Sequence, residues 1–115
     1  MSRTSAVGRE CEARAAAFLT GQGLTLLDTN FRCRGGEIDL VLRDGEHLVF
    51  VEVRYRRSSA FGGPLESVDA RKQQRLMLAA RHYLARRGNR DACRFDVIGM
   101  DGSGRLEWVK DAFSA

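Results

Sequence analysis

The stretch from residue 37 to residue 55, EIDLVLRDGEHLVFVEVRY, decides the fold of this chain of 115 residues. Two runs rich in valine, leucine and isoleucine, Glu37 to Arg43 and Glu46 to Tyr55, lie on either side of Asp44-Gly45. Asp-Gly supplies the positive φ angles of a two-residue type I′ turn, and apolar runs on both sides are typical of strands. The stretch therefore predicts an antiparallel β-hairpin.

A two-residue turn at Asp44-Gly45 also predicts which residues face one another across the hairpin. In that register Glu37 lies opposite Glu52, and Asp39 lies opposite Phe50. Side chains alternate between the two faces of a strand. One face is then expected to carry Glu37, Asp39, Glu52 and Arg54, and the other Ile38, Leu40, Leu42, Val49, Val51 and Val53.

The carboxylates on the polar face create an electrostatic problem that a cation would solve. Directly opposed glutamates lie about 5 Å apart at Cβ, so Glu37 and Glu52 cost stability unless their charges are neutralised. Oxygen ligands are what Mg²⁺ and Mn²⁺ prefer, whereas zinc prefers histidine and cysteine. The two histidines, His47 and His82, fall away from this face. We therefore expect Mg²⁺ or Mn²⁺ to bind here.

A simpler alternative is that these acids face solvent, each beside a neighbouring arginine, on a half-exposed hairpin. Glu52 argues against it, because this residue interrupts the run Leu48 to Val53. That run is apolar enough to be a central strand buried on both faces, where a carboxylate without a partner is costly. We therefore expect Asp39 and Glu52 to have a functional role.

Two helices are predicted, one on either side of the hairpin in the chain. The first spans residues 6–20, with Ser5 as its N-cap, and Gly21-Gln22-Gly23 ends it. The second spans about residues 68–87 and ends at Gly88. Its core-facing stripe is expected to consist of Val68, Lys72, Leu76, Ala79, Ala80, Tyr83 and Leu84.

Three further strands complete the expected fold. Leu24 to Leu27 is a short apolar run followed by a loop through Gly36, and residues 95–100 and 105–109 form a second hairpin around Asp101-Gly102-Ser103-Gly104. The order αβββαββ indicates an α/β fold with a mixed central sheet flanked by helices. No linker or repeat interrupts the sequence, so residues 1–115 are expected to form one domain.

Periodicity brings two more charged residues toward the polar face of the hairpin. On the first helix, Glu12 lies at the edge of the core-facing stripe, whereas Glu10 points away from it. On the second helix, Lys72 occupies a core-facing position where an apolar residue is the norm, so it could contact a phosphate. The alternatives are a glutamate at the solvent edge and a lysine whose stem alone is buried.

Composition limits the function classes that fit. Of 19 basic residues, 17 are arginine, whose planar fork suits phosphate oxygens, and the net charge is +4. No apolar run reaches 18 residues and no signal peptide is evident, so we expect a cytoplasmic protein without a membrane span. Cys11, Cys33 and Cys93 fit neither a disulfide framework nor a zinc site, and we expect reduced packing residues.

Four stretches together resemble, in order and spacing, the bacterial YraN family: GGEIDLVL from Gly35, VFVEVRYRR from Val49, the Lys72-x-x-Arg-Leu stretch and RFDV from Arg94. The resemblance spans nearly the whole chain. It implies a restriction-endonuclease-like core, similar to that of Holliday junction resolvases and PD-D/E-x-K nucleases, and action on nucleic acid. It makes Asp39 the motif aspartate, Glu52 the following acid, Arg54 the residue at the usual lysine position and Glu12 the helix-one glutamate, with Glu37 in the Gly-Glu-Ile-Asp stretch.

The chain departs from the superfamily pattern at two positions. Ile38 replaces the proline before the motif aspartate, which matters little. Arg54 replaces lysine, and arginine cannot deprotonate water, although it can stabilise charge on a phosphorane. The departure at Arg54 leaves open whether the chain is an enzyme.

The favoured hypothesis is hydrolysis of phosphodiester bonds in structured DNA, with Mg²⁺ or Mn²⁺ held by Asp39 and Glu52, aided by Glu12 and Glu37. Action on a two-fold junction would favour a homodimer. The backbone would be bound by Lys72 and by loop arginines, namely Arg32, Arg34, Arg56 and Arg57. Two alternatives stay open: a nucleic-acid-binding or repair-accessory protein that has lost cleavage, and a protein-interaction module whose arginines face an acidic partner.

Overall fold

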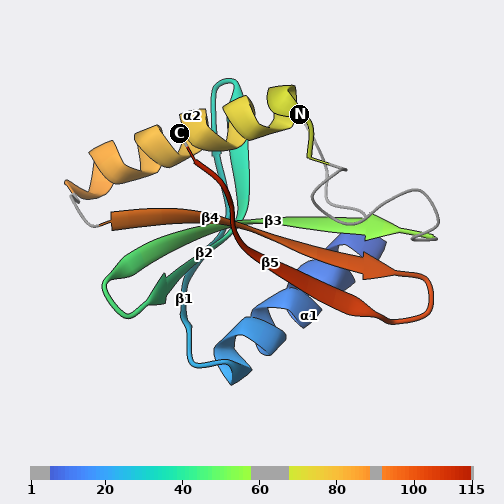
Figure 1. Ribbon diagram of the computed structural model, residues 1–115. Helices are drawn as coiled ribbons and strands as arrows, with labels where there is room; N and C mark the ends of the chain where they lie inside the picture. The colour runs from blue at the N-terminus through green and yellow to red at the C-terminus, as the bar shows by residue number, and fades with distance from the viewer. Residues whose placement is uncertain (1–5, 58–67, 89–91, 115) are drawn as a thin grey trace.

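The computed structural model describes residues 6–57, 68–88 and 92–114 of the chain. Within these residues, two helices and five strands follow one another in the order αβββαββ that the sequence predicts (Figure 1). In chain order they are α1 (Ala6–Gly21), β1 (Thr25–Cys33), β2 (Gly36–Asp44), β3 (His47–Arg56), α2 (Ala70–Arg87), β4 (Ala92–Asp101) and β5 (Leu106–Phe113).

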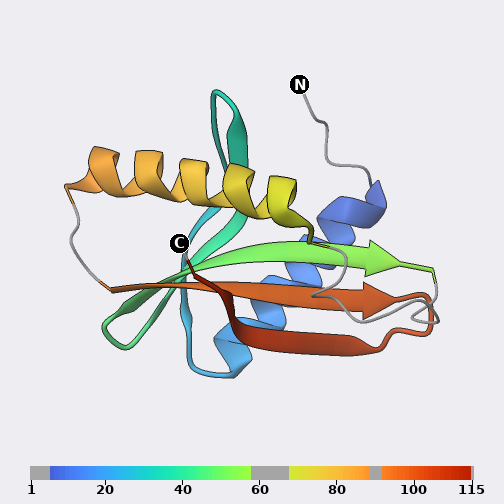
Figure 2. The same cartoon turned by 45° about the horizontal axis from the view of Figure 1, so that its top comes forward.

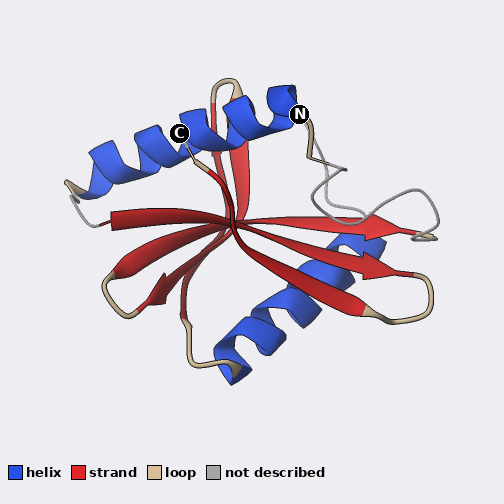
Figure 3. Ribbon diagram, in the orientation of Figure 1, coloured by secondary structure: helices blue, strands red, loops and turns tan. Residues whose placement is uncertain are grey.

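The five strands form one sheet whose spatial order equals the chain order, β1-β2-β3-β4-β5. Neighbours are antiparallel except β3 and β4, which run parallel. A parallel pair needs a crossover connection, and α2 lies in that connection. Figure 3 shows α1 and α2 on opposite sides of the sheet. The predicted α/β class and mixed central sheet flanked by helices are confirmed.

Each helix buries its apolar stripe against one face of the sheet. Residues Val49 and Val51 of β3 pack in the cluster beneath α1, whereas Leu48 and Phe50 pack in the cluster beneath α2. The strand is therefore buried on both faces, as its apolar run predicts. The helix residues that fill the two clusters are Cys11, Ala15 and Leu19 from α1, and Leu76, Ala79, Ala80 and Tyr83 from α2.

The turn of the central hairpin differs from the predicted one. Asp44 pairs with His47, so Gly45 and Glu46 form the two-residue loop, with Gly45 at φ 60°. The predicted pairing of Arg43 with Glu46 is wrong, because Arg43 lies opposite Leu48. The predicted register is thus wrong by two residues. Because side chains alternate with a period of two, this shift leaves Glu52 and Arg54 on their predicted face.

The two strands of the hairpin separate before they reach the acidic residues. Leu40 and Val51 are the last pair of the β2–β3 ladder, and beyond them β2 pairs only with β1 among the described residues. Ile38 accordingly packs in the α2 cluster and not with Leu40, which corrects the predicted face of Ile38. The predicted pairing of Asp39 with Phe50 is wrong, because Phe50 lies opposite Val41. The predicted opposition of Glu37 and Glu52 is also wrong, because the β2–β3 ladder ends before Glu37, which pairs with Arg32 on β1.

Several element boundaries extend past the predicted ones. Strand β1 continues from Thr25 to Cys33 although its polar middle looked like a loop, because long-range pairing with β2 carries it through a bulge between Leu26 and Asp28. Helix α2 begins at Ala70, after the N-cap Asp69, so Val68 of the predicted stripe lies before the helix. Gly88 ends the helix, as predicted, in the left-handed conformation. The predicted N-cap Ser5 lies outside the described residues.

Exposure of the remaining singled-out side chains follows expectation in most cases. His47 and His82 are both exposed. Cys11 is buried and Cys33 half-buried, but Cys93 is exposed and so is not a packing residue. Neither helix described here is long and apolar enough to cross a membrane.

Candidate active site

The candidate site forms where β2 leaves β3. Just past the last paired residues, the backbone N–H of Val53 donates a hydrogen bond of 2.8 Å to Oδ2 of Asp39. This bond ties the Asp39 side chain of one strand to the backbone of the other, at a point where their backbones no longer pair. It therefore fixes Asp39 beside the segment of β3 that carries Glu52 and Arg54.

Asp39 is the electrostatic centre of the site. Burial raises the pKa of its carboxyl well above the ordinary value, the charge of Glu52 raises this pKa further, and the Val53 N–H opposes both effects. The charges of Glu12 and Glu37 also raise the pKa of Asp39. Four carboxylates from α1, β2 and β3 thus repel one another here, and we call Glu12, Glu37, Asp39 and Glu52 the acidic site.

Two cations act on Glu52, one of the four carboxylates of the acidic site. Its side chain is 16% exposed, and its Oε2 lies 3.4 Å from Nη1 of Arg54. Burial raises the pKa of Glu52, whereas the charges of Arg54 and Lys72 lower it. Lys72 occupies the first turn of α2 and is half-buried. The structure thus brings the charges of Arg54 and Lys72 near Glu52.

Glu12 and Glu37 form the rim of the acidic site. Glu12 is half-buried on α1, where Nδ2 of Asn30 donates to its Oε1 over 3.1 Å; burial raises the pKa of Glu12 despite this bond, and Glu37 raises it further. Glu37 is 35% exposed and lies 3.7 Å from Nε of Arg32. Glu10 is exposed, as predicted. Both rim glutamates therefore have polar partners, which makes them less dependent on a cation than Asp39.

The donor set fits a divalent cation only in part. Among residues 6–57, 68–88 and 92–114, no three His, Cys, Asp or Glu side chains are arranged to hold a metal ion by themselves. Mg²⁺ is commonly held by one or two carboxylates together with substrate phosphates and water. Asp39 and Glu52 suit that partial set, because both are desolvated oxygen donors that repel each other. The four-carboxylate metal set stays a prediction.

The predicted backbone-binding arginines do not form a single cluster. Arg34 lies in the turn between β1 and β2, whereas Arg32 lies within β1 and Arg56 within β3, so neither is the loop residue expected. Arg57 follows β3, and its carbonyl accepts a hydrogen bond from Gly102 in the β4–β5 turn. Arg56 lies about 13 Å along the strand from Glu52, on the same face.

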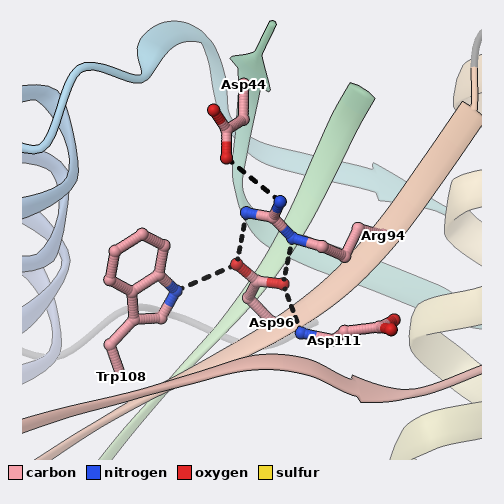
Figure 4. Close-up of polar contacts among 5 residues, drawn as sticks. All are labelled: Asp44, Arg94, Asp96, Trp108 and Asp111. Atoms are coloured by element: carbon pink, nitrogen blue, oxygen red, sulfur yellow. Dashed lines mark hydrogen bonds and ion pairs between the residues drawn. The ribbon is translucent and has the colours of Figure 1, made fainter. Parts of the chain in front are cut away.

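A second charged cluster escaped the analysis of the sequence, and Figure 4 shows it. Asp96 on β4 is fully buried and accepts two bonds from Arg94, one from Trp108 Nε1 and one from the Asp111 backbone, and Arg94 also reaches Asp44. Every charge here has a partner, so the cluster has a structural role. The signal was the alternation of Arg94 and Asp96 inside an apolar strand.

Comparison with known proteins gives one consistent result. A family model with the description "Uncharacterised protein family UPF0102" matches residues 11–100. A UPF0102 protein of Dechloromonas aromatica is 55% identical over 112 residues, which cover 97% of this chain and 92% of that protein. A UPF0102 protein of Alcanivorax borkumensis is 51% identical over 92% of this chain and 90% of that protein. A UPF0102 protein of Stutzerimonas stutzeri is 48% identical over 100% of both chains. None of these descriptions states an activity.

Proposed function

The chain belongs to the uncharacterised protein family UPF0102, and from its acidic site we propose that it is a Mg²⁺- or Mn²⁺-dependent nuclease that hydrolyses phosphodiester bonds in structured DNA. The observation that carries the proposal is the pair Asp39 and Glu52, two desolvated carboxylates whose charges repel each other beside Arg54 and Lys72. Carboxylates and cations placed together suit a ligand that brings both a divalent cation and an anionic phosphate.

The contacts around the pair indicate what each residue would do. Asp39 and Glu52 would hold the cation, which when bound supplies polarisation of the scissile phosphate and a more acidic water. The Val53 N–H keeps Asp39 fixed for this task. Arg54 would stabilise negative charge that develops on the phosphate, because its guanidinium stays protonated. Lys72 would bind a phosphate oxygen from the start of α2.

The fold and the resemblance to resolvase-like nucleases favour DNA as the substrate and a homodimer as the active form, since a four-way junction is two-fold symmetric. The order αβββαββ and the mixed sheet agree with the endonuclease-like core that the resemblance implies. Arginine dominates the basic residues, and its planar fork can bind two phosphate oxygens, which supports a phosphate-containing substrate.

The test is a cleavage assay on nicked, flapped and four-way DNA with Mg²⁺, Mn²⁺ or EDTA. We expect cleavage that needs the cation and that Asp39→Ala and Glu52→Ala each lower at least about 100-fold, since each removes a cation ligand. Glu10→Ala is the matched control: it removes an exposed glutamate from α1 and should change nothing. Cleavage that survives Glu52→Ala would identify a contaminating nuclease and refute the proposal.

A non-catalytic nucleic-acid-binding protein is the second candidate, and Arg54 is the observation that favours it. Arginine cannot take a proton from water, and Arg54 stands at the position where most nucleases of the resembled superfamily carry lysine. Intact DNA throughout the panel, combined with cation binding that Asp39→Ala abolishes, would select this candidate.

A further inference from the structure

Helix α2 has a composition that its packing does not require. Its 18 residues include Lys72, no aspartate or glutamate, and five arginines, namely Arg71, Arg75, Arg81, Arg86 and Arg87. All five arginines are exposed. A solvent-facing helix surface ordinarily mixes charges of both signs, because pairs at i and i+4 stabilise it. An acid-free helix forgoes that stabilisation and presents uncompensated positive charge to the solvent.

Three of these arginines lie on one flank of the helix. At 100° per residue, Arg71, Arg75 and Arg86 fall within about 60° of one another, beside the stripe that contains Leu76 and Tyr83. Figures 1 and 2 show the end of the β1–β2 hairpin beside α2, and Gly36 at this end lies close to the carbonyl oxygen of Arg75 on the same flank. We call Arg34, Arg71, Arg75 and Arg86 the α2 arginine row.

Close backbone contact holds the hairpin turn in this row. A Cβ at Gly36 would collide with the carbonyl oxygen of Arg75, and one at Gly35 would lie 3.1 Å from Cδ2 of Leu78. Arg34, which precedes these glycines, is therefore carried next to the middle of α2. Near the other end of the helix, the Arg86 guanidinium lies over the Phe31 ring, 5.4 Å from its centroid. The hairpin thus lies close to Arg75 in the middle of α2 and to Arg86 near its end.

The side chains of the row are available to an outside partner. Within the described part of the chain, Arg34, Arg71 and Arg75 make no side-chain hydrogen bond or ion pair, in contrast to Arg94 in the buried cluster. Arg86 contacts the Phe31 ring and likewise makes no side-chain hydrogen bond or ion pair within residues 6–57, 68–88 and 92–114. Four guanidinium groups thus retain donors for bidentate bonds to phosphate.

The row begins at the acidic site. Lys72, which acts electrostatically on Glu52, is next to Arg71 in the first two residues after the start of α2. From Lys72 to Arg86 the helix rises 1.5 Å per residue, or about 21 Å in total. The repeat of a DNA strand is 3.4 Å, so the row matches about six nucleotides on one side of the acidic site.

We propose that the α2 arginine row binds the phosphate backbone of the nucleic acid that flanks the acidic site, along about six nucleotides. The proposal rests on the proposed function, and it places the path of the bound nucleic acid along α2. The position of the row favours a nucleic acid over an acidic protein, because a phosphate backbone bound at the acidic site would continue from Lys72 along α2. Each guanidinium fork along the row can bind two phosphate oxygens. Contacts of this kind read backbone charge and not base sequence.

The experiment measures DNA affinity by fluorescence anisotropy over a series of salt concentrations, in EDTA, so that it needs neither cation binding nor cleavage. The triple variant Arg71→Gln, Arg75→Gln and Arg86→Gln tests the row. The matched control, Arg14→Gln, Arg105→Gln and Lys110→Gln, removes the same charge from the α1 and β5 side, where all three side chains are exposed. Thermal melting of each variant checks that it is folded.

For the row variant we expect the slope of log K against log salt to become smaller in magnitude by about 2.7, because each of the three lost phosphate contacts contributes about 0.9. We also expect binding to be at least about tenfold weaker. The control variant should keep most of the wild-type slope. Equal losses in both variants would show a general charge effect and overturn the proposal. A second probe, poly-glutamate, stands for an acidic protein. If the row variant loses binding to poly-glutamate but keeps its affinity for DNA, the partner is an acidic protein and the proposal is overturned.

The same measurements separate this inference from the proposed function. Absence of cleavage together with a reduced slope in the row variant would refute the nuclease and keep the row as a backbone-binding surface. Cleavage with an unchanged slope would keep the nuclease and refute the row.

Discussion

Two aspartates of the sheet, the half-buried Asp39 and the fully buried Asp96, should respond in opposite ways to the same substitution. Asp96 has four hydrogen bonds and an arginine partner, whereas Asp39 has one backbone donor and three glutamates around it. Asparagine has nearly the shape of aspartate but carries no charge. We therefore predict that Asp39→Asn stabilises the protein in the absence of divalent cations and that Asp96→Asn destabilises it.

The sign for Asp39 follows from its raised pKa, caused first by burial and then by Glu52. When the pKa of a carboxyl is higher in the folded than in the unfolded state, the folded protein loses stability as pH rises from about 3.9 through the folded-state pKa. At pH values above that window, each unit by which folding raises the pKa lowers the free energy of unfolding by about 1.4 kcal/mol, or Tm by roughly 5 °C for a chain of this size. Asparagine removes this cost, and its carbonyl oxygen can still accept the Val53 N–H.

The magnitude for Asp96 comes from its ion pair. Arg94 is 15% exposed and donates to both Asp96 oxygens, so neutralising Asp96 leaves a largely buried guanidinium with Asp44 as its remaining carboxylate. Breaking a buried pair on one side costs about 3 to 5 kcal/mol. Asp96→Asn should therefore lower Tm by at least about 10 °C.

The assay is thermal and urea unfolding of wild type and both variants in EDTA, from about pH 4 to pH 8. The stability advantage of Asp39→Asn should be near zero at pH 4 and grow as pH rises through the range in which the folded protein titrates. An Asp39→Asn variant that is less stable than wild type at pH 8, or that differs from it by a constant amount at every pH, would refute the reasoning. The carboxylate would then be a structural ligand of Val53.

Three further predictions test other parts of the structure. Gly36→Ala should destabilise the fold by about 2 kcal/mol in urea unfolding, because the new Cβ meets the Arg75 carbonyl of α2, whereas Gly45→Asn in the open turn should be nearly neutral. Asp69→Ala should cost about 1 kcal/mol by the same measurement, since it removes the N-cap bond to the Lys72 N–H. Mn²⁺ at about 100 times its Kd should raise the unfolding free energy of wild type by about 2.7 kcal/mol and leave Asp39→Asn unchanged; equal stabilisation of both would exclude Asp39 as a ligand.

The sequence by itself was enough for the order of helices and strands and for the central hairpin, although not for the length of β1. The period-2 pattern around Asp44-Gly45 predicted the hairpin, and the apolar run around Glu52 predicted a strand buried on both faces. These features depend on neighbours in the chain, whose side chains alternate at fixed spacing. The face of Glu52 and Arg54 was robust for the same reason, because the error in register was an even number.

Only the tertiary structure decided which charges meet. The split of β2 from β3 beyond Leu40 depends on the pairing of β2 with β1 and on the close approach of Gly36 to α2, and no local pattern encodes either contact. Because the strands separate, Glu37 lies opposite Arg32 and not opposite Glu52, and Asp39 can accept a hydrogen bond from the Val53 N–H. Burial at that point desolvates the acids and so sets their pKa values, a property of the packed protein that the sequence does not contain.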